Sequence, residues 1–278
     1  MKVTVLVDNN TMIDRYFLGE PGVSFYIQES GKNIIFDVGY SDAFIRNAQK
    51  MRINIYDIDY VAISHGHIDH TWGFVPMISL YNEAANEKLS FRKPVLLAHE
   101  EAFSGKYHGK DVIGSVVNEK ALSDYFEVKL RNEPFWITEK LVFLGQIERT
   151  NDFENREPIG THIHKGIEKE DFLLDDTALA YKSGEGLVII TGCSHSGICN
   201  ITEYAKKICK VNRVDDIIGG LHLLNPDKNR LELTSKYISR LGLKKLHACH
   251  CTDLRSKIVL SGVADVADVG VGLQLEYE

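Results

Sequence analysis

The sequence of 278 residues lacks the features of a membrane or secreted protein. Its apolar runs, such as 187–190, are far shorter than the roughly 18 residues that a membrane-spanning helix needs. Residues 1–7 alternate like a strand and show no basic stretch followed by a long apolar stretch, the pattern of a secretory signal. We therefore expect a protein of the cytoplasm that contacts no membrane.

Cysteine is scarce, and its spacing matches neither a disulfide framework nor a structural zinc ribbon. The number of cysteines is odd, and no C-x-x-C pair occurs. The five residues are Cys193, Cys199, Cys209, Cys249 and Cys251. Reduced thiols are the expected state.

An excess of basic residues is also absent. The formal net charge of -7 argues against a broad basic surface that would neutralise the phosphates of nucleic acid. A small-molecule substrate is the expected partner, whereas the composition carries no information on the oligomeric state. The hydrophobic fraction of 44% is enough for one sizeable core, so we expect a single domain.

Short apolar runs rich in β-branched residues recur along the chain and predict strands. These runs are 3–7, 24–27, 33–36, 60–63, 94–98, 141–144, 187–190, 216–218 and 245–248. Helices are predicted between them at 41–51, 74–86, 200–209 and 225–241. Strands interleaved with helices, and turns such as Ser30-Gly31 between close strands, predict an α+β protein with mixed sheets.

Two local features qualify this pattern. Asn200, followed by Glu203, predicts a capping box at the start of the helix 200–209. The least regular stretch, 100–139, is rich in charge and glycine, and it is a candidate lid or insertion over a site.

A dense group of potential metal ligands follows the predicted strand 60–63. The segment reads Ser64-His65-Gly66-His67-Ile68-Asp69-His70, in a loop at a strand end, where functional residues concentrate. Imidazole and carboxylate ligands suit zinc, and iron and manganese are also compatible because the pattern does not fix a geometry. An incidental polar loop is the alternative, which this density of ligands disfavours.

The H-x-H-x-D-H pattern resembles the signature of the metallo-β-lactamase superfamily. The segments 35–39, 192–197 and 250–252 also resemble motifs of that superfamily. Together with 22–25, 145–150 and 219–223, they are similar to one branch, that of 7,8-dihydropterin-6-methyl-4-(β-D-ribofuranosyl)aminobenzene 5′-phosphate synthase. The resemblance implies one domain over 1–278, an αββα sandwich of two mixed sheets flanked by helices, with a metal site at one edge between the sheets.

The resemblance also implies six metal ligands. They are His65, His67, Asp69, His70, His195 and His250. His65 and His67 would bind the first ion, and Asp69 and His70 the second. His250 could alternatively be a buried polar residue. Asp37 is expected to orient a ligand histidine without contacting the metal.

One position departs from the superfamily pattern. A bridging aspartate usually follows a glycine after a strand, and here the corresponding pair is Gly192-Cys193. Either Cys193 ligates as a thiolate, or His195 replaces one ligand and an acid such as Asp176 serves from the neighbouring hairpin. We favour His195, while ligation by Cys193 and its burial as a small apolar residue both stay open.

These implications predict a binuclear metal-dependent hydrolase with two divalent ions, zinc or else manganese or iron. The expected substrate is a phosphate ester or phosphodiester of a small molecule, and the branch implies a pterin or ribosyl phosphate. Asp69 is expected to act in catalysis as well as in metal binding. His222 either donates to a substrate oxygen or is a hydrogen-bonded core histidine.

Two other classes of protein stay open. A di-iron redox protein is the first, although superfamily members of that kind carry a flavin-binding domain for which this chain has no length. Metal analysis with a visible spectrum would distinguish it. The second is a non-catalytic sensor of a metal or small ligand, which the intact H-x-H-x-D-H pattern disfavours.

Overall fold

The computed structural model describes residues 1–278, apart from the side chain of His164. Its strands are β1 Lys2–Val7, β2 Ser24–Glu29, β3 Lys32–Phe36, β4 Tyr60–Ala62, β5 Val95–Ala98, β6 Gly105–His108, β7 Asp111–Val112, β8 Glu127–Leu130, β9 Phe135–Trp136, β10 Leu141–Phe143, β11 Thr161–His164, β12 Ile167–Glu170, β13 Ala178–Lys182, β14 Leu187–Thr191, β15 Val214–Gly220, β16 Lys245–Cys249 and β17 Gln274–Glu276. Its helices are α1 Ala43–Lys50, the 3₁₀ turn η1 Ile55–Asp57, α2 Ile68–Thr71, α3 Phe74–Asn86, α4 Glu119–Ser123, α5 Ile198–Cys209, α6 Lys228–Leu241 and α7 Leu254–Ser261.

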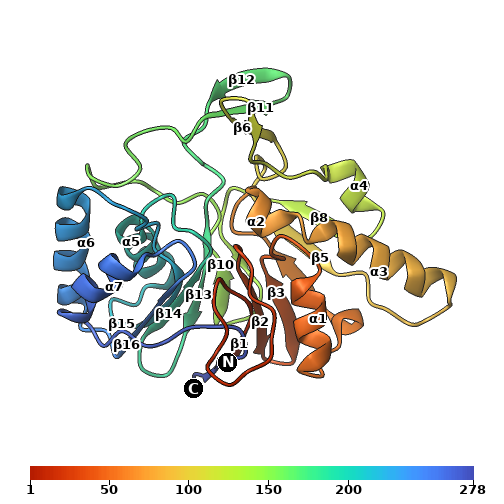
Figure 1. The fold of residues 1–278 in the computed structure, drawn as a ribbon, viewed down its shortest axis with the longest axis horizontal. Coiled ribbons are helices and arrows are strands. Elements are labelled where there is room, and N and C mark those ends of the chain that lie inside the picture. The colour runs from red at the N-terminus through yellow and green to blue at the C-terminus, as the bar shows by residue number, and fades with distance from the viewer.

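Two sheets face each other in the middle of the molecule, and helices cover their outer faces (Figure 1). The first sheet has the strand order β17-β1-β2-β3-β4-β5-β8, and the second has β16-β15-β14-β13-β10-β9. Both are mixed, because β3, β4, β5 and β8 run parallel in the first sheet and β14, β15 and β16 run parallel in the second. The predicted αββα sandwich of the α+β class is confirmed.

The strands in the middle of the sandwich are buried on both faces. In β14, Val188 and Ile190 pack between the two sheets, whereas Leu187 and Ile189 pack under the helices of the second sheet. This alternation follows from the period of two in a strand. It explains why these segments read as continuous apolar runs in the sequence.

The predicted strands and helices are present, with ends that shift by a few residues, but the predicted capping box is wrong. Helix α5 begins earlier, at Ile198, and its free amides at Cys199 and Asn200 both donate to the carboxylate of Glu154 at 3.0 Å. The Asn200 side chain instead accepts the Thr150 amide at 2.8 Å. The free amides of α5 are therefore bound by a carboxylate that is distant in the sequence and not by the predicted local cap.

The irregular stretch 100–139 divides between several sheets. Strand β8 extends the first sheet, and β9 pairs with β10 in the second. Strands β6 and β7 instead join β11 and β12 in a separate four-stranded sheet, which stands above the sandwich at the top of Figure 1. Only part of the stretch therefore projects from the sandwich.

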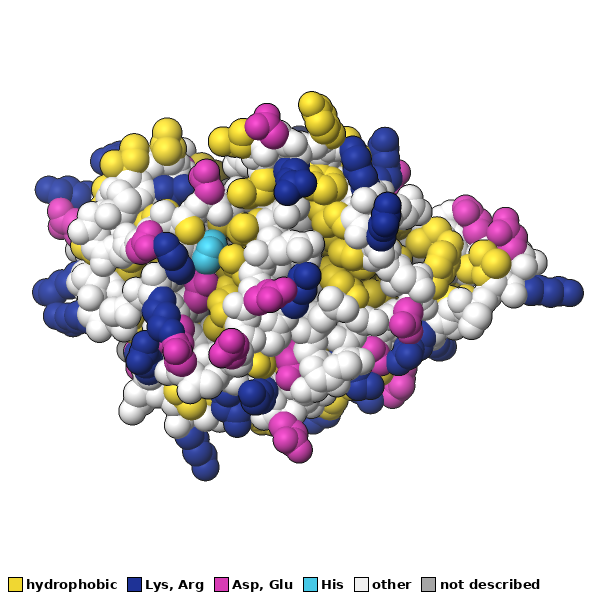
Figure 2. Space-filling view, turned by 90° about the horizontal axis from the view of Figure 1, so that it is seen from below, with side chains coloured by type: hydrophobic (Ala, Val, Ile, Leu, Met, Phe, Trp, Pro, Cys, Tyr) yellow, Lys and Arg dark blue, Asp and Glu magenta, His cyan; other side chains and the backbone are white. Residues whose placement is uncertain are grey.

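Within the described residues, no helix is long and apolar enough to cross a membrane. Figure 2 shows the face of the molecule seen from below, where basic and acidic side chains are interspersed. This face carries no extended patch of one sign.

Candidate metal centre

The predicted ligands come together at one edge of the sandwich, where parallel strands of both sheets end. Asp37 follows β3, and His65 follows β4. From the second sheet, His195 follows β14, His222 follows β15 and His250 follows β16. The carboxyl ends of parallel strands share one edge, and ligand sites of α/β sheets form there.

Several of these strand ends adopt left-handed backbone conformations without glycine. The φ angles are 59° at Asp37, 61° at Ser194, 51° at His222 and 51° at His250. Such conformations are uncommon for non-glycine residues and persist where surrounding contacts fix them, often at functional sites. The chain turns sharply at each point, and this turn directs the neighbouring side chains toward the edge.

His65, His67 and His195 form the first ligand cluster. The Nε2 atom of His65 lies 3.1 Å from Nδ1 of His67 and 3.1 Å from Nε2 of His195. Burial holds the pKa of His65 and of His195 well below the usual range, and it lowers the pKa of His67 to about 4. The three rings are therefore neutral, which is the form that binds a metal ion.

Asp69, His70, Cys193 and His250 form the second cluster. The Sγ atom of Cys193 lies 3.3 Å from Nε2 of His70 and 3.1 Å from Nε2 of His250. The Oδ2 atom of Asp69 lies 3.3 Å from Nε2 of His250. Burial disfavours the charged Asp69, but His70 and His250 outweigh it and hold the pKa of Asp69 below its usual value.

The two residues that compete as ligand at the Gly192-Cys193 turn both lie in a ligand cluster. His195 lies in the first cluster and Cys193 in the second, and Ser194 with its left-handed turn separates them. Asp176 lies outside both clusters and accepts the Ser196 amide at 2.8 Å. Burial raises the pKa of Asp176 to about 6.

Hydrogen bonds fix the orientation of two histidines, one from each cluster. Ser64 Oγ lies 2.9 Å from Nδ1 of His65, and Asp37 Oδ2 lies 2.7 Å from Nδ1 of His70, which leaves both Nε2 atoms facing the clusters. Asp37 also accepts the Ser64 hydroxyl at 2.6 Å. Gly192 must be glycine, because a Cβ there would lie 2.1 Å from Ser64 Oγ. Carboxylate and hydroxyl partners of this kind set the tautomer of ligating histidines.

The donor set fits metal ions. In the first cluster, His65 Nε2 lies within 3.1 Å of both His67 Nδ1 and His195 Nε2. In the second, Cys193 Sγ lies within 3.3 Å of both His70 Nε2 and His250 Nε2. Atoms that can donate a lone pair to a metal ion therefore converge in each cluster. The two clusters hold seven potential ligands, more than one tetrahedral ion can use, and the ring centroids of His65 and His70 lie only 4.1 Å apart. Imidazole, carboxylate and thiolate together suit zinc or iron.

A buried ion-pair network anchors the loop of the first cluster, and no sequence pattern predicts it. Lys106 of β6 is fully buried, with its Nζ 2.9 Å from Asp175 and 3.0 Å from Asp171. Asp175 also accepts the Gly66 amide at 2.8 Å. Burial opposes the charge on Lys106, but Asp175 and Asp171 outweigh it and raise the pKa of Lys106. The projecting sheet is thereby tied to the metal-binding loop.

His222 lies beside the first cluster and outside the ligand groups. Its ring centroid is 4.2 Å from that of His195, and its side chain is partly exposed. Its backbone amide donates to the Cys251 thiol at 3.3 Å. The imidazole therefore borders the first cluster without belonging to it.

Comparisons with known proteins agree with this geometry. A sequence model of the Metallo-beta-lactamase superfamily matches residues 18–85, which include the whole 65–70 motif. An uncharacterized protein of Methanocaldococcus jannaschii is 30% identical over 263 residues, which cover 93% of each chain. The chain belongs to the metallo-β-lactamase superfamily.

Two further superfamily relatives match over nearly the whole chain. One is the 7,8-dihydropterin-6-methyl-4-(β-D-ribofuranosyl)-aminobenzene-5′-phosphate synthase of M. jannaschii, 29% identical over 265 residues that cover 92% of this chain and 89% of the relative. The other is a solved structure described as a metal-dependent hydrolase of the β-lactamase superfamily. It aligns with a TM-score of 0.82 and 29% identity, over 99% of this chain and 98% of its own.

Proposed function

We propose that this superfamily member is a binuclear metal-dependent hydrolase that cleaves a phosphate ester or phosphodiester of a small molecule. One observation carries the proposal, namely the two adjacent clusters of buried ligands at one edge of the sandwich. His65, His67 and His195 would hold the first ion. The second would be held by Asp69, His70, Cys193 and His250.

The chemistry follows from where the reachable groups lie. Divalent ions, when bound, supply Lewis acidity that polarises a phosphoryl oxygen and lowers the pKa of water. The Asp69 side chain is 27% exposed, whereas His70 beside it is fully buried, so Asp69 can accept a hydrogen bond from an attacking water. His222 lies on the first-cluster side and can donate a proton to the leaving oxygen.

The relatives support a substrate class. The name of the M. jannaschii synthase contains a dihydropterin and a ribofuranosyl 5′-phosphate, and the solved relative is described as a hydrolase. We therefore propose a pterin or ribosyl phosphate as the substrate, with cleavage at the phosphate. Zinc is the proposed metal, with manganese or iron as alternatives, and the cytoplasm is the proposed location.

Turnover of p-nitrophenyl phosphate and bis-p-nitrophenyl phosphate by the metal-loaded protein tests this proposal. We expect release of p-nitrophenol from at least one ester, and a loss of about 100-fold or more in the Asp69→Asn variant, which keeps the size of the side chain but loses its charge. Asp124→Asn, at an exposed position after α4, is the matched control. Near-wild-type turnover of a fully loaded Asp69→Asn protein would exclude the role of Asp69. Absence of turnover with both esters would contradict the proposed function.

A further inference from the structure

We infer that the cavity beside the metal clusters binds a planar aromatic ring of the substrate while the phosphate of the same molecule lies at the two ligand clusters. The inference rests on the proposed function, because it assigns the uncharged part of the phosphate ester. It adds a specificity site that the ligand clusters do not define.

The cavity has a volume of about 530 Å³ and adjoins both clusters, because His67 of the first cluster and Asp69 of the second are among its lining residues. The rest of the wall is mainly apolar, with Tyr40, Ile68 and Ile113 among its residues. Small-molecule sites have this size and this combination of an apolar wall with a few polar groups. A ligand that fills it therefore has a polar end at the clusters and an apolar body.

The lining residue Tyr40 belongs to a stacked aromatic pair, and its ring favours a planar ligand ring over an alkyl chain. Tyr40 lines the cavity with 43% of its surface exposed, and Trp72 stacks on it with ring centroids 5.2 Å apart and planes 19° apart. Trp72 Nε1 donates to the Gly114 carbonyl at 3.0 Å, and the Tyr40 amide donates to Glu20 at 3.0 Å. The pair is held in place before any ligand arrives, and another ring gains offset or edge contacts against it.

The position of this pair relative to the metal ligands is fixed by the chain itself. Trp72 directly follows α2, the short helix that carries Asp69 and His70. Two other lining residues are joined by a backbone hydrogen bond, in which the Ile68 amide donates to the Ile113 carbonyl at 3.0 Å. This bond ties the projecting sheet to the same helix. The ring site and the ligand clusters therefore share one rigid element.

The charge of the cavity decides which part of a substrate enters it. Asp111 and His108 are exposed lining residues, whereas Asp69 belongs to the second cluster. The Asp111 carboxylate disfavours an anion beside it, and divalent ions held by the clusters would offset the charge of Asp69. The phosphate therefore belongs at the clusters, and the uncharged ring belongs against the apolar residues. Asp111 can accept a hydrogen bond from an N–H or O–H on the ring edge.

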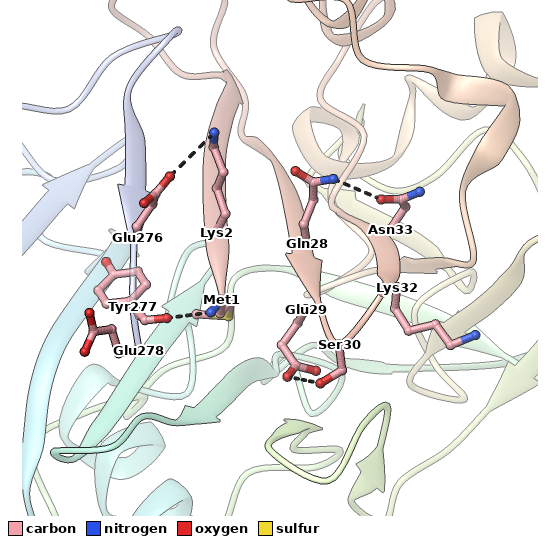
Figure 3. A pocket seen from close by; sticks show the side chains of 11 residues that line it. Met1, Lys2, Gln28, Glu29, Ser30, Lys32, Asn33, Glu276, Tyr277 and Glu278 are labelled. Atoms are coloured by element: carbon pink, nitrogen blue, oxygen red, sulfur yellow. Dashed lines mark hydrogen bonds and ion pairs between the residues drawn. The ribbon is translucent and has the colours of Figure 1, made fainter.

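A second cavity, of about 560 Å³, lies at the chain termini and does not share these properties. Figure 3 shows that its polar groups pair with one another, as Lys2 does with Glu276 at 3.7 Å and Ser30 with Glu29 at 2.6 Å. Its lining includes none of the ligand residues. It has no adjoining reactive centre.

Calorimetric titration of the metal-loaded protein with methylphosphonate and phenylphosphonate tests the inference without relying on turnover, because neither has an ester bond to hydrolyse. We expect phenylphosphonate to bind about 10-fold more tightly or better, since the ring gains burial and aromatic contacts that a methyl group lacks. Tyr40→Ala should bring the two affinities within about 2-fold of each other while the affinity for methylphosphonate stays unchanged, which also shows that the variant is folded. Tyr16→Ala, at a tyrosine that is 87% exposed on another loop, is the matched control and should keep the preference.

The fluorescence of Trp72 tests whether the ligand ring binds beside the Tyr40–Trp72 pair. In a Trp136→Phe background Trp72 is the remaining tryptophan, and 4-nitrophenylphosphonate, whose ring quenches a nearby indole, should lower its emission whereas methylphosphonate should not. Equal binding of phenylphosphonate and methylphosphonate, or a preference that survives Tyr40→Ala, would overturn the inference. If the ring preference depends on Tyr40 but no phosphate ester is cleaved, the proposed function fails and the ring site stands. If esters are cleaved without any ring preference, the ring site alone fails.

Discussion

The Lys106→Met substitution tests the link between the projecting sheet and the metal-binding loop. The side chain of Lys106 is fully buried between Asp171 and Asp175, so its loss leaves two carboxylates in a site without solvent. Removal of one partner from a buried ion pair costs about 3 to 5 kcal/mol. We expect the free energy of unfolding, from urea denaturation near neutral pH, to fall by that amount. Lys110→Met, at an exposed lysine in the β6–β7 turn, should change it by less than about 0.5 kcal/mol.

The size of this loss should depend on pH. Burial disfavours the charged Asp175, but Lys106 outweighs it and lowers the pKa of Asp175 in the folded protein. The stabilisation is thus present above the unfolded pKa and disappears as pH falls through the folded one. Without Lys106, burial is opposed only by the weaker effects of His99 and the Gly66 amide, so the pKa of Asp175 is higher in the variant than in the wild type. Protonation of Asp175 therefore lessens the destabilisation of the variant as pH falls. The difference in the free energy of unfolding between wild type and variant should decrease from about pH 7 to about pH 5. A difference that does not change with pH, or a variant as stable as the wild type, would refute the reasoning.

The remaining predictions concern the two clusters. In cobalt-substituted protein, Cys193→Ser should eliminate a thiolate charge-transfer band. His195→Ala should retain that band but lower the metal affinity about 10-fold or more. Cys209→Ser, on α5, is the control for both variants. A band unaffected by Cys193→Ser would remove Cys193 from the ligand set. Gly192→Ala should weaken metal binding, measured by competition with a chelator, because the new Cβ would lie 2.1 Å from Ser64 Oγ and displace the partner of His65. Full affinity in that variant would show that Ser64 does not orient the ring.

The sequence could predict those parts of the site that depend on local order. The ligands from His65 to His70 lie in one short segment after a strand, so a single strand end brings them together. The later histidines follow parallel strands, whose carboxyl ends must meet at one edge. The αββα order of the layers could be predicted only from the resemblance to the superfamily, because no local sequence pattern determines how sheets and helices stack.

The parts that could not be predicted depend on backbone turns or on contacts between distant segments. Cys193 and His195 are two residues apart, and the left-handed turn at Ser194 decides that they enter different clusters. Lys106 pairs with Asp175 across a long stretch of chain, and a lysine in an irregular charged segment reads as exposed. The predicted cap of α5 is wrong for a similar reason, because the carboxylate that accepts its free amides belongs to Glu154, which is distant in the sequence.

The number of ions bound per chain tests the central claim most directly. The two clusters predict two divalent ions per chain, measured by elemental analysis of protein loaded with excess zinc and then dialysed. Each cluster should lose its ion separately, the first in His67→Ala and the second in His250→Ala. A fully loaded protein that holds one ion, with His70 and His250 free of metal, would contradict the two-metal account.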